Sequence, residues 1–297
     1  MSDIFVVGAL HLDVVVEAPR LPMLDETLFG DSVAYRFGGK GGNQALAAAR
    51  MGAQVSMAGR VGEDAFAGRV LEVLQASGVD LSQVRQVPGA TGMSVAIVEA
   101  AGDYGAVVVS GVNQTIAAAE VDAGSARIVL LQNEFPEAVN LAVVRRKAPV
   151  MKVVLNAAPA RATATELLRG VDVLIVNRVE AAQMTGVTAE GLDPEGAAVA
   201  LQAFGPSAVV VTLGADGAVV LEEDRLDWVR PPLCATGSAH GAGDTFVGTL
   251  AAEMAGGQSL QDAAGFAAAA AAFFVGLEPD ARPAMTRASV GTWLSTL

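Results

Sequence analysis

Short aliphatic runs alternate with alanine-rich helical patterns along most of this 297-residue chain. The runs are almost continuous in Val, Ile and Leu, which is typical of strands buried on both faces of a parallel sheet. Six runs predict strands, at residues 4–8, 54–58, 127–131, 152–156, 172–177 and 208–214. Helical patterns lie among them at residues 43–51, 66–76, 136–146 and 194–204. The alternation predicts an α/β fold, a doubly wound, mostly parallel sheet with helices on both faces.

Two stretches depart from this rhythm. Residues 13–37 are strand-like and contain Pro19 and Pro22, and residues 92–99 and 106–110 have the pattern of a β-hairpin. We expect a small β-sheet, formed by about residues 11–37 and 91–112, that projects from the main layer. Such a sheet can act as a lid that excludes water from transfer chemistry, and a plain edge extension is the alternative.

The last third of the chain has mostly helical patterns. Ser259 and Asp262 have the spacing of a capping box ahead of an apolar helix over residues 263–275. The apolar stretch 263–277 is shorter than the ~18 residues that indicate a membrane span. Because no linker rich in Pro, Gly or Ser divides the chain, we expect one domain over residues 1–297.

The composition excludes several classes of function. With 32 acidic and 19 basic residues the net charge is −13 at pH 7, which disfavours binding to nucleic acid or to a membrane surface. The single cysteine, Cys234, and the two histidines exclude an internal disulfide and a Cys- or His-rich metal cluster. The N-terminus carries no cationic leader, so the cytoplasm is the expected compartment.

A glycine-rich segment, GAGDTFVG at residues 241–248, leads into a helical run. Small residues ahead of a helix let backbone N–H groups converge on an anion, and the helix dipole favours negative charge there. Asp244 is expected in the first helical turn, where it could accept a proton from a hydroxyl that attacks phosphorus. The alternative is that Asp244 only begins the helix and that the glycines only form the turn.

A second glycine-rich segment, FGGKGGNQA at residues 37–45, also enters a helix. Its glycines permit close backbone approach to a ligand, Lys40 supplies a cation, and Asn43 can both donate and accept hydrogen bonds. The segment is neither a Walker loop nor the dinucleotide fingerprint, because the spacing of each is missing.

Together, these two segments resemble the ribokinase-like (PfkB-type) carbohydrate kinase family. Further matches follow in the family's order at residues 91–92, 111–113, 131–134, 156–160, 177–180 and 212–217. The resemblance implies an ATP-dependent kinase that uses Mg2+ to phosphorylate a primary hydroxyl of a ribose-like sugar. It also implies a homodimer that pairs through the lid.

By matching positions, the resemblance implies the role of each site residue. Asp244 corresponds to the catalytic base, and Gly241, Ala242 and Gly243 to the anion hole. The sugar-binding positions are His11, Asp13, Gly39, Lys40, Asn43 and Glu134, with His11 and Asp13 expected at the carboxyl end of the first strand. Asn177 and Glu180 correspond to the motif that organises Mg2+ through water, and Thr212, Gly214 and Gly217 to the nucleotide loop.

The chain departs from the family at Ser238 and His11, in or beside the site. Ser238 stands where potassium-activated members have an aspartate that ligates the cation, so potassium activation is not expected. His11 replaces an asparagine, which argues for a sugar other than ribose. His240, directly before the anion hole, is expected to pack against the sheet, and a contact with phosphate or substrate is the alternative. A nucleoside kinase of the same fold and an inactive sugar- or nucleotide-binding regulator are the alternative functions.

Overall fold

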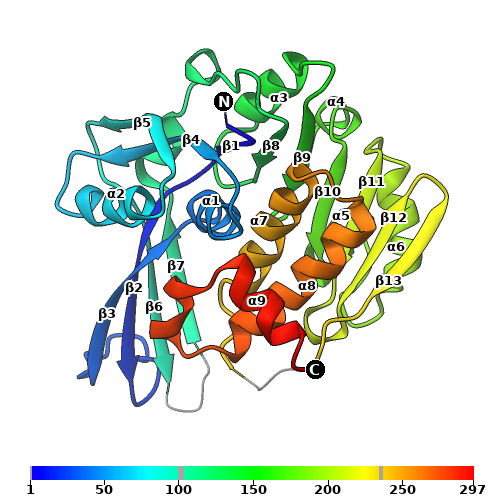
Figure 1. Cartoon of the computed structure of the whole chain (residues 1–297). Coiled ribbons are helices and arrows are strands. Elements are labelled where there is room, and N and C mark those ends of the chain that lie inside the picture. Colours follow the sequence, from blue (N-terminus) through cyan, green and yellow to red (C-terminus); the bar gives the residue numbers. More distant parts are fainter. Residues whose placement is uncertain (1, 100–103, 234–236) are drawn as a thin grey trace.

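A nine-stranded sheet forms the centre of the molecule (Figure 1), and the computed structural model describes residues 2–99, 104–233 and 237–297. The seven strands at one side pair in parallel, and the last two pair antiparallel at the other edge. In spatial order they are β5 (Asp80–Val87), β4 (Val55–Gly62), β1 (Ile4–Val7), β8 (Ile128–Leu131), β9 (Lys152–Asn156), β10 (Val173–Asn177), β11 (Ala208–Thr212), β12 (Ala218–Glu222) and β13 (Arg225–Val229).

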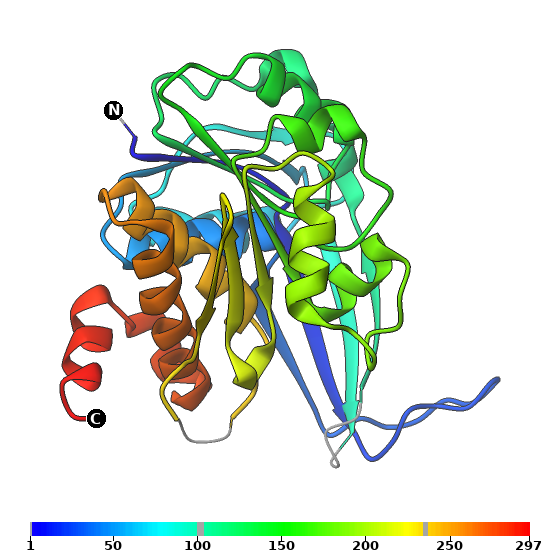
Figure 2. The same ribbon diagram turned by 90° about the vertical axis from the view of Figure 1, so that its right-hand side faces the viewer.

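Helices cover both faces of this sheet (Figures 1 and 2). One layer contains α1 (Lys40–Arg50), α2 (Ala67–Ala76), α7 (Ala242–Ala255), α8 (Leu260–Gly276) and α9 (Arg287–Leu294). The other contains α3 (Glu137–Arg145), α4 (Thr165–Arg169), α5 (Arg178–Thr185) and α6 (Pro194–Gln202). Short 3₁₀ turns are η1 (Gly111–Thr115), η2 (Ala118–Glu120), η3 (Gly214–Asp216) and η4 (Pro279–Ala284).

The sheet separates two hydrophobic cores, as strands buried on both faces require. Along β1, the side chains of Ile4 and Val6 join the core beneath α7 and α8, whereas Phe5 and Val7 join the core on the α3 and α6 side. All four side chains are at most 1% exposed. The predicted doubly wound α/β fold is therefore confirmed.

A separate four-stranded sheet projects from the body (Figure 1). Its order is β3 (Ser32–Gly38), β2 (His11–Ala18), β6 (Gly92–Glu99) and β7 (Tyr104–Val109), with β2 parallel to β6 and the other pairs antiparallel. The predicted hairpin of β6 and β7 is confirmed, although residues 101–103 of its expected turn lie outside the described part. The connection between β2 and β3, residues 19–31, extends away from the body (Figure 2).

The structure corrects three of the predicted elements. His11 and Asp13 do not end the first strand: β1 stops at Val7, and both residues belong to β2 of the small sheet. The last third is helical from Ala242 onward, as predicted, but β12 and β13 form an antiparallel hairpin at residues 218–229 that was not predicted. The apolar helix begins at Leu260 rather than at residue 263.

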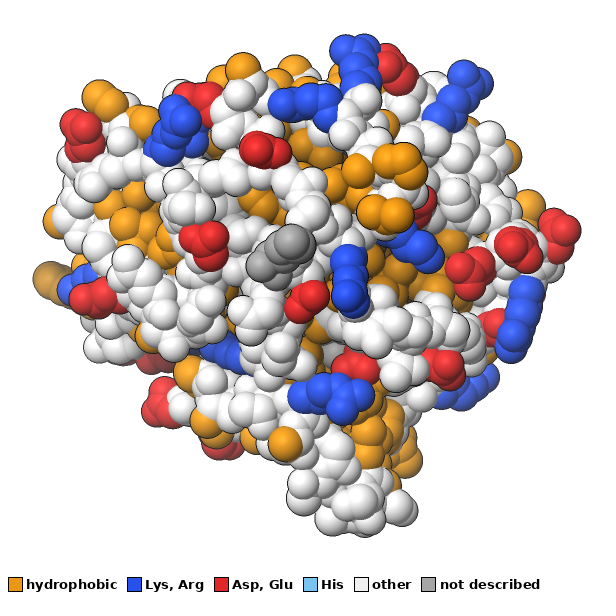
Figure 3. All heavy atoms as spheres, turned by 45° about the horizontal axis from the view of Figure 1, so that its top comes forward, with side chains coloured by type: hydrophobic (Ala, Val, Ile, Leu, Met, Phe, Trp, Pro, Cys, Tyr) orange, Lys and Arg blue, Asp and Glu red, His pale blue; other side chains and the backbone are white. Residues whose placement is uncertain are grey.

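Ser259 is the N-cap of α8, as predicted, but the capping box is only half formed. The Ser259 hydroxyl oxygen accepts the Asp262 N–H at 3.1 Å, and its O–H donates to the Asp262 carboxylate at 2.6 Å. Among the helices described, none has the length and apolar character needed to cross a membrane. On the face shown in Figure 3, acidic and basic side chains are interspersed between hydrophobic ones.

The contact of α7 with α1 generates a prediction about Gly248. A Cβ at this position would lie 2.4 Å from the Gln44 carbonyl oxygen and 2.6 Å from the Ala47 Cβ, so Gly248→Ala must push the two helices apart. We expect the free energy of unfolding, measured by urea titration, to fall by ~1–3 kcal/mol.

Gly265→Ala in α8 is the matched control, since no heavy atom lies within 4 Å of its added Cβ. This variant should be neutral or gain up to ~1 kcal/mol from helix propensity. Equal free energies of unfolding for the two variants would contradict the proposed tight contact.

Candidate active site

The first turn of α1 lies directly against the chain that follows β1. A Cβ on Gly41 would come within 2.5 Å of the Gly8 Cα, so only two glycines allow the backbones to approach this closely. The segment between β1 and β2 is held by Asn113, whose side chain accepts the Leu10 N–H and donates to the Leu10 carbonyl, both at 3.0 Å. These contacts place Lys40 and Asn43 at the carboxyl end of the central strand, where open α/β sheets bind ligands.

The N-terminus of α7 presents unpaired backbone N–H groups. Gly241 is its N-cap, with φ of 83°, a left-handed conformation that favours glycine. Among the described residues, no acceptor pairs with the N–H groups of Gly241, Gly243 and Asp244. The N–H of Ala242 donates to the Ala239 carbonyl at 3.0 Å, so Ala242, predicted as part of the anion hole, does not supply an unpaired donor. A helix of 14 residues adds the positive end of its dipole, so this turn can bind an anion.

Asp244 lies in this first turn, as predicted, and two side-chain amides hold its carboxylate. Asn43 Nδ2 donates to Oδ2 at 3.3 Å, and Gln44 Nε2 donates to Oδ1 at 3.0 Å. Both donors come from α1, so the α1–α7 contact brings the two glycine-rich segments together. The carboxylate is thereby oriented beside the unpaired N–H groups.

A chain of buried amides fixes Gln44 in turn. Gln44 Oε1 accepts from Gln132 Nε2, and Gln44 Nε2 also donates to Asn156 Oδ1, each at 2.9 Å. Gln44 and Gln132 are fully buried. The sequence analysis missed this network, although Gln44 and Gln132 lie within the quoted segments 37–45 and 131–134. A glutamine in an apolar helix next to Asn43 was an available signal.

Lys40 lies among three carboxylates. Burial alone would lower the pKa of its ammonium, but the neighbouring negative charges outweigh burial and raise that pKa above its ordinary value. These charges belong to Asp244, Glu134 and Glu180. Glu134 Oε2 also accepts the Lys40 N–H at 2.7 Å. The lysine therefore stays protonated at the point where the predicted sugar, base and metal residues meet.

Glu134 has the largest pKa shift in the site. Burial raises the pKa of its carboxyl to about 7, and the charges of Asp244 and Asp13 act in the same direction, against the opposing Lys40 N–H and ammonium. Carboxylates from two different elements, β2 and α7, thus act on one side chain. The group is poised to change charge near neutral pH.

Asp13 lies on β2 and faces this cluster. Ser94, its partner on β6, donates a hydroxyl hydrogen bond to Oδ1 at 2.6 Å. His11 is buried beside it, and its Nε2 has no hydrogen-bond partner among the described residues. Burial lowers the pKa of His11, against the charge of Asp13, so its imidazole is neutral at pH 7. Ser94 is a further residue that the sequence analysis missed.

His240 does not pack against the sheet, contrary to our expectation. Its side chain is 73% exposed, and Nε2 lies 3.9 Å from Asp13 Oδ2. The contact brings the segment ahead of α7 next to the small sheet. The sequence signal was its position directly before Gly241.

Asn177 and Glu180 form a capping box at the start of α5. The Asn177 Oδ1 accepts the Glu180 N–H, and the Glu180 Oε2 accepts the Asn177 N–H, both at 2.8 Å. Burial raises the pKa of Glu180, and the charge of Asp244 adds to the effect, whereas the Asn177 N–H and Lys40 oppose it. Glu180 is therefore both a structural cap and a member of the charged cluster.

The nucleotide-loop residues lie next to this cap. Thr212 at the end of β11 pairs in register with Asn177 on β10, and its hydroxyl donates to the Val176 carbonyl at 3.3 Å. Gly214 and Gly217 bound the tight η3 turn, closed by the Leu213 N–H bond to the Gly217 carbonyl at 2.7 Å. Within the described residues, neither glycine is hydrogen-bonded to Asp244 or Lys40.

The donor set fits a weakly ligated Mg2+ bound with phosphates. Among the described residues no group of three or more His, Cys, Asp or Glu side chains could form a metal cage. Burial is the main cause of the raised pKa of Glu180, and the charge of Asp244 adds to it; a divalent cation would relieve this repulsion. Mg2+ usually retains several waters and takes one or two carboxylates in phosphate-binding sites.

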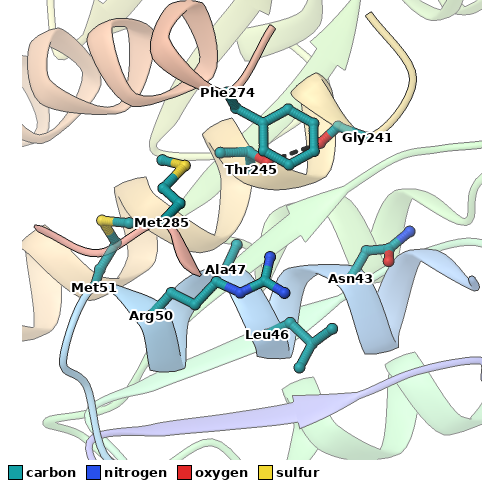
Figure 4. Close-up of a pocket in the computed structure, with 9 residues that line it drawn as sticks. All are labelled: Asn43, Leu46, Ala47, Arg50, Met51, Gly241, Thr245, Phe274 and Met285. Carbon is teal, nitrogen blue, oxygen red and sulfur yellow. Dashed lines mark hydrogen bonds between the residues drawn. The ribbon is translucent and has the colours of Figure 1, made fainter. Parts of the chain in front are cut away.

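A small pocket borders the site between α1, α7 and α8 (Figure 4). Asn43 and Gly241 lie at one end, Met51 and Met285 at the other, and Phe274 lies against Gly241 and Thr245. The Thr245 hydroxyl donates to the Gly241 carbonyl at 2.9 Å, which fastens the N-cap to the helix.

Comparisons with known proteins agree with this geometry. The model of the pfkB family carbohydrate kinases matches residues 1–285. Ribokinase of Haemophilus influenzae is 33% identical over 280 residues, which cover 91% of this chain and 91% of that protein. A crystal structure of ribokinase from Thermotoga maritima has a TM-score of 0.90 at 25% identity and covers 99% of this chain and 100% of its own. Ribokinase of Arabidopsis thaliana, complexed with ribose and ATP, has a TM-score of 0.89 at 30% identity and covers 99% and 98%.

The raised pKa of Glu134 predicts how stability depends on pH. Since the pKa is about 7 in the fold and 4.5 as the reference value, the protonated form is favoured by folding. Stability from this group is present below pH ~4.5 and is lost as the pH rises toward ~7. Glu134→Gln, which cannot ionise, should therefore raise the free energy of unfolding at pH 8 relative to wild type by on the order of 1–3 kcal/mol, and by much less at pH 5.

Glu166→Gln is the control, because Arg145 lowers the pKa of the Glu166 carboxyl, first by a hydrogen bond. Stability from that group is lost only as the pH falls below the ordinary range of glutamate, so the change in unfolding free energy between pH 5 and 8 should match wild type. Urea titrations at pH 5, 6.5 and 8 measure both. A Glu134→Gln variant with the wild-type pH dependence would refute the interpretation.

Proposed function

Because the chain belongs to the pfkB family of carbohydrate kinases, and is thus a phosphotransferase that acts on an alcohol, we propose that it transfers the γ-phosphate of ATP to a primary hydroxyl of a ribose-like sugar. The observation that carries the proposal is the Asp244 carboxylate, oriented by Asn43 and Gln44 beside three unpaired N–H groups of α7. A base and an anion-binding turn at one point are the parts that phosphoryl transfer to a hydroxyl needs.

The sugar would be held between the small sheet and the first turn of α1. Asp13 accepts hydrogen bonds from neighbouring hydroxyls, and His11, Gly39, Lys40, Asn43 and Glu134 complete the set of donors and acceptors. Ser94 fixes one Asp13 oxygen by its 2.6 Å hydrogen bond, which leaves the other for the substrate. A vicinal diol matches such a carboxylate because both hydroxyls can donate to it.

Transfer then follows from the position of Asp244. Its carboxylate takes the proton of the primary hydroxyl while the hydroxyl oxygen bonds to the γ-phosphorus and the bond from phosphorus to the β-phosphate oxygen breaks, releasing ADP. The N–H groups of Gly241 and Gly243 face the negative charge on the transferred group, with Ala242 between them in the same turn. Lys40 adds a fixed positive charge.

Thr212, Gly214 and Gly217 line the nucleotide in this proposal, and Asn177 and Glu180 hold Mg2+ through water. The ion, when bound, neutralises charge on the phosphates. Glu180 suits this role because its carboxylate is already fixed by the capping box. No potassium ion is required: the Ser238 hydroxyl accepts the His240 N–H at 3.4 Å and contributes no charge.

We also propose a homodimer in which the small sheet acts as a lid. Tyr35, Val95 and Val107 share the sheet face opposite Asp13, since each pairs in register through β2, β3, β6 and β7. They are 48%, 40% and 66% exposed. Tyr35 stacks partly on Phe66 of the same chain, and a second copy of the chain would cover the part of this apolar row that a monomer leaves exposed. A kinase with one cysteine that consumes ATP fits the cytoplasm.

Asp244→Asn tests the mechanism. Loss of a positioned general base should lower kcat by ~10²–10⁴-fold, while the affinity for ADP, measured by calorimetry, stays within a few-fold of wild type. Coupled ADP release is assayed with a panel of pentoses, hexoses and nucleosides, which also separates a sugar kinase from a nucleoside kinase and from an inactive binding protein. Asp262→Asn, in the first turn of α8, is the matched control.

The result that contradicts the proposal is an Asp244→Asn variant with near-normal kcat. A parallel loss of ADP affinity and kcat would instead make Asp244 a structural residue. Wild-type protein that releases no ADP with any sugar or nucleoside would exclude kinase activity altogether.

Sugar selection is predicted to depend on Asp13 and His11. Asp13→Ala should lower kcat/KM by ~10-fold or more, because it leaves a hydroxyl of the bound diol unpaired. The corresponding deoxy sugar should cost the wild type a similar factor, and the two losses should not add, since they remove one contact. His11→Asn should shift the preference among pentoses toward ribose.

These variants are assayed on the same sugar panel from pH 5.5 to 8.5. Because burial lowers the pKa of His11, its effect on KM should be constant at and above pH 7. If Asp13→Ala leaves every sugar unaffected, the sugar pocket lies elsewhere. If ribose is the best wild-type substrate and His11→Asn changes nothing, His11 serves only the structure.

A further inference from the structure

Arg282, in η4 just after α8, donates to three backbone carbonyl oxygens. Nη2 reaches Ser238 O at 2.8 Å, Nε reaches Leu277 O at 3.3 Å and Nη1 reaches His240 O at 3.4 Å. Within the described part of the chain, no carboxylate lies within 4.0 Å of its nitrogens. Although the chain has 32 acidic residues, the hydrogen-bond acceptors of this arginine are peptide carbonyls rather than carboxylates.

The three carbonyls belong to two segments that meet at the anion-binding turn. Leu277 is the C-cap of α8, where the helix dipole places negative charge, and Ser238 and His240 lie directly ahead of the N-cap Gly241 of α7. The segments are closely packed, since a Cβ on Gly237 would come within 2.2 Å of the Val275 carbonyl oxygen. Arg282 therefore joins the end of one helix to the start of the other.

The Phe274 ring packs against both the Arg282 guanidinium and the N-cap of α7. The Arg282 guanidinium carbon lies 4.4 Å from the centre of the Phe274 ring, and the same ring would be 3.4 Å from a Cβ on Gly241. Cation–π contact and three hydrogen bonds restrict the guanidinium plane. The arginine, the ring and the N-cap form one packed unit, whose ring and N-cap are drawn in Figure 4.

The direction of one peptide group links this unit to the turn. In a trans peptide the C=O and the following N–H point in opposite directions. A guanidinium that holds the His240 carbonyl therefore also sets the direction of the Gly241 N–H, one of the three unpaired donors of the turn. It further offsets three carbonyl dipoles whose negative ends would otherwise weaken an anion site nearby.

We propose that Arg282 is a positioning residue for phosphoryl transfer: its guanidinium acts as a built-in cation that holds the Ser238–Gly241 backbone so that the turn before Asp244 binds the γ-phosphate. This inference rests on the proposed kinase function and adds a residue that touches neither substrate. It also accounts for the proposed independence from potassium, because the Arg282 guanidinium already supplies a positive charge to the carbonyl oxygens of the Ser238–Gly241 segment.

The test compares Arg282→Ala and Arg282→Lys with Arg145→Ala, whose arginine is exposed and pairs with Glu166. Arg282→Ala should lower kcat by ~10–100-fold with a sugar KM near wild type, because a small displacement of the turn affects the transferred group most. Low millimolar guanidinium should restore much of the lost kcat, whereas tetramethylammonium at equal ionic strength should not. Arg282→Lys should lie between, and Arg145→Ala should equal wild type.

Wild-type kcat should stay within a few-fold when K+ is replaced by tetramethylammonium. The proposal is overturned if Arg282→Ala keeps wild-type kcat, or if kcat falls together with the melting temperature and guanidinium restores neither. Strong, saturable activation of the wild type by K+ would also overturn it, since the carbonyls would then bind an external cation.

A binding measurement separates this proposal from the kinase assignment. Calorimetry with a non-hydrolysable ATP analogue and with ADP reports on the γ-phosphate position without turnover. Arg282→Ala should lose ~10-fold or more in affinity for the analogue and little for ADP, with the analogue affinity recovered by guanidinium. If wild type binds the analogue but phosphorylates nothing, the proposed function fails and Arg282 is still tested; equal losses for both nucleotides would refute the role of Arg282.

Discussion

The site depends on the close backbone contacts of α1 with its two neighbours. Gly41 lets the first turn of α1 rest on Gly8 at the end of β1, and Gly248 lets α7 lie against the Gln44 carbonyl. Neither contact tolerates a side chain without movement, because a Cβ at either position would come within 2.5 Å of another atom. As a result, α1 places Lys40 at the carboxyl end of the central strand and directs the Asn43 and Gln44 side chains to Asp244. Backbone packing alone, without any charge interaction, therefore brings two glycine-rich segments that are far apart in the chain into one site.

The charged cluster is costly to folding and useful to function. Lys40 has three carboxylates around it, so the negative charges are only partly compensated, and burial, with the charges of Asp244 and Asp13 added, raises the pKa of Glu134 to about 7. A pair of hydrophobic residues in these positions would be more stable, as buried ion pairs repay their desolvation poorly. In the proposed function the same uncompensated negative charge would favour a divalent cation bound with ATP, because the cation supplies the missing positive charge. The electrostatic cost to folding therefore lies where bound ligands reduce it.

The sequence predicted the central layer better than its edges, for a physical reason. Strands buried on both faces are continuous aliphatic runs, so β9 was predicted at its observed bounds, residues 152–156, and β1 was predicted one residue too long. The edge strands β5 and β13 carry polar residues at exposed positions and lack that signal, whereas the sequence analysis missed β12, a buried aliphatic run between β11 and β13. The motif residues Lys40, Asn43, Glu134 and Asp244 do lie together, whereas Gln44, Gln132 and Ser94 entered only with the structure. Their partners are distant in the chain, and no local pattern encodes a hydrogen bond between residues 44 and 244.

The two halves of the site are built from different parts of the fold, and they meet at one carboxyl group. Asp13 belongs to the small sheet and Asp244 to the N-terminus of α7, yet both charges raise the pKa of Glu134 on the segment after β8. Because the effect of a charge on a pKa weakens with distance, Asp13 and Asp244 both lie near Glu134 and border the same space. The His240 ring, 3.9 Å from Asp13, approaches that space from the segment that Arg282 holds. Any movement of the small sheet toward α7 therefore acts on the Asp13 carboxylate and on the N-terminal turn of α7 at once, as the proposed lid requires.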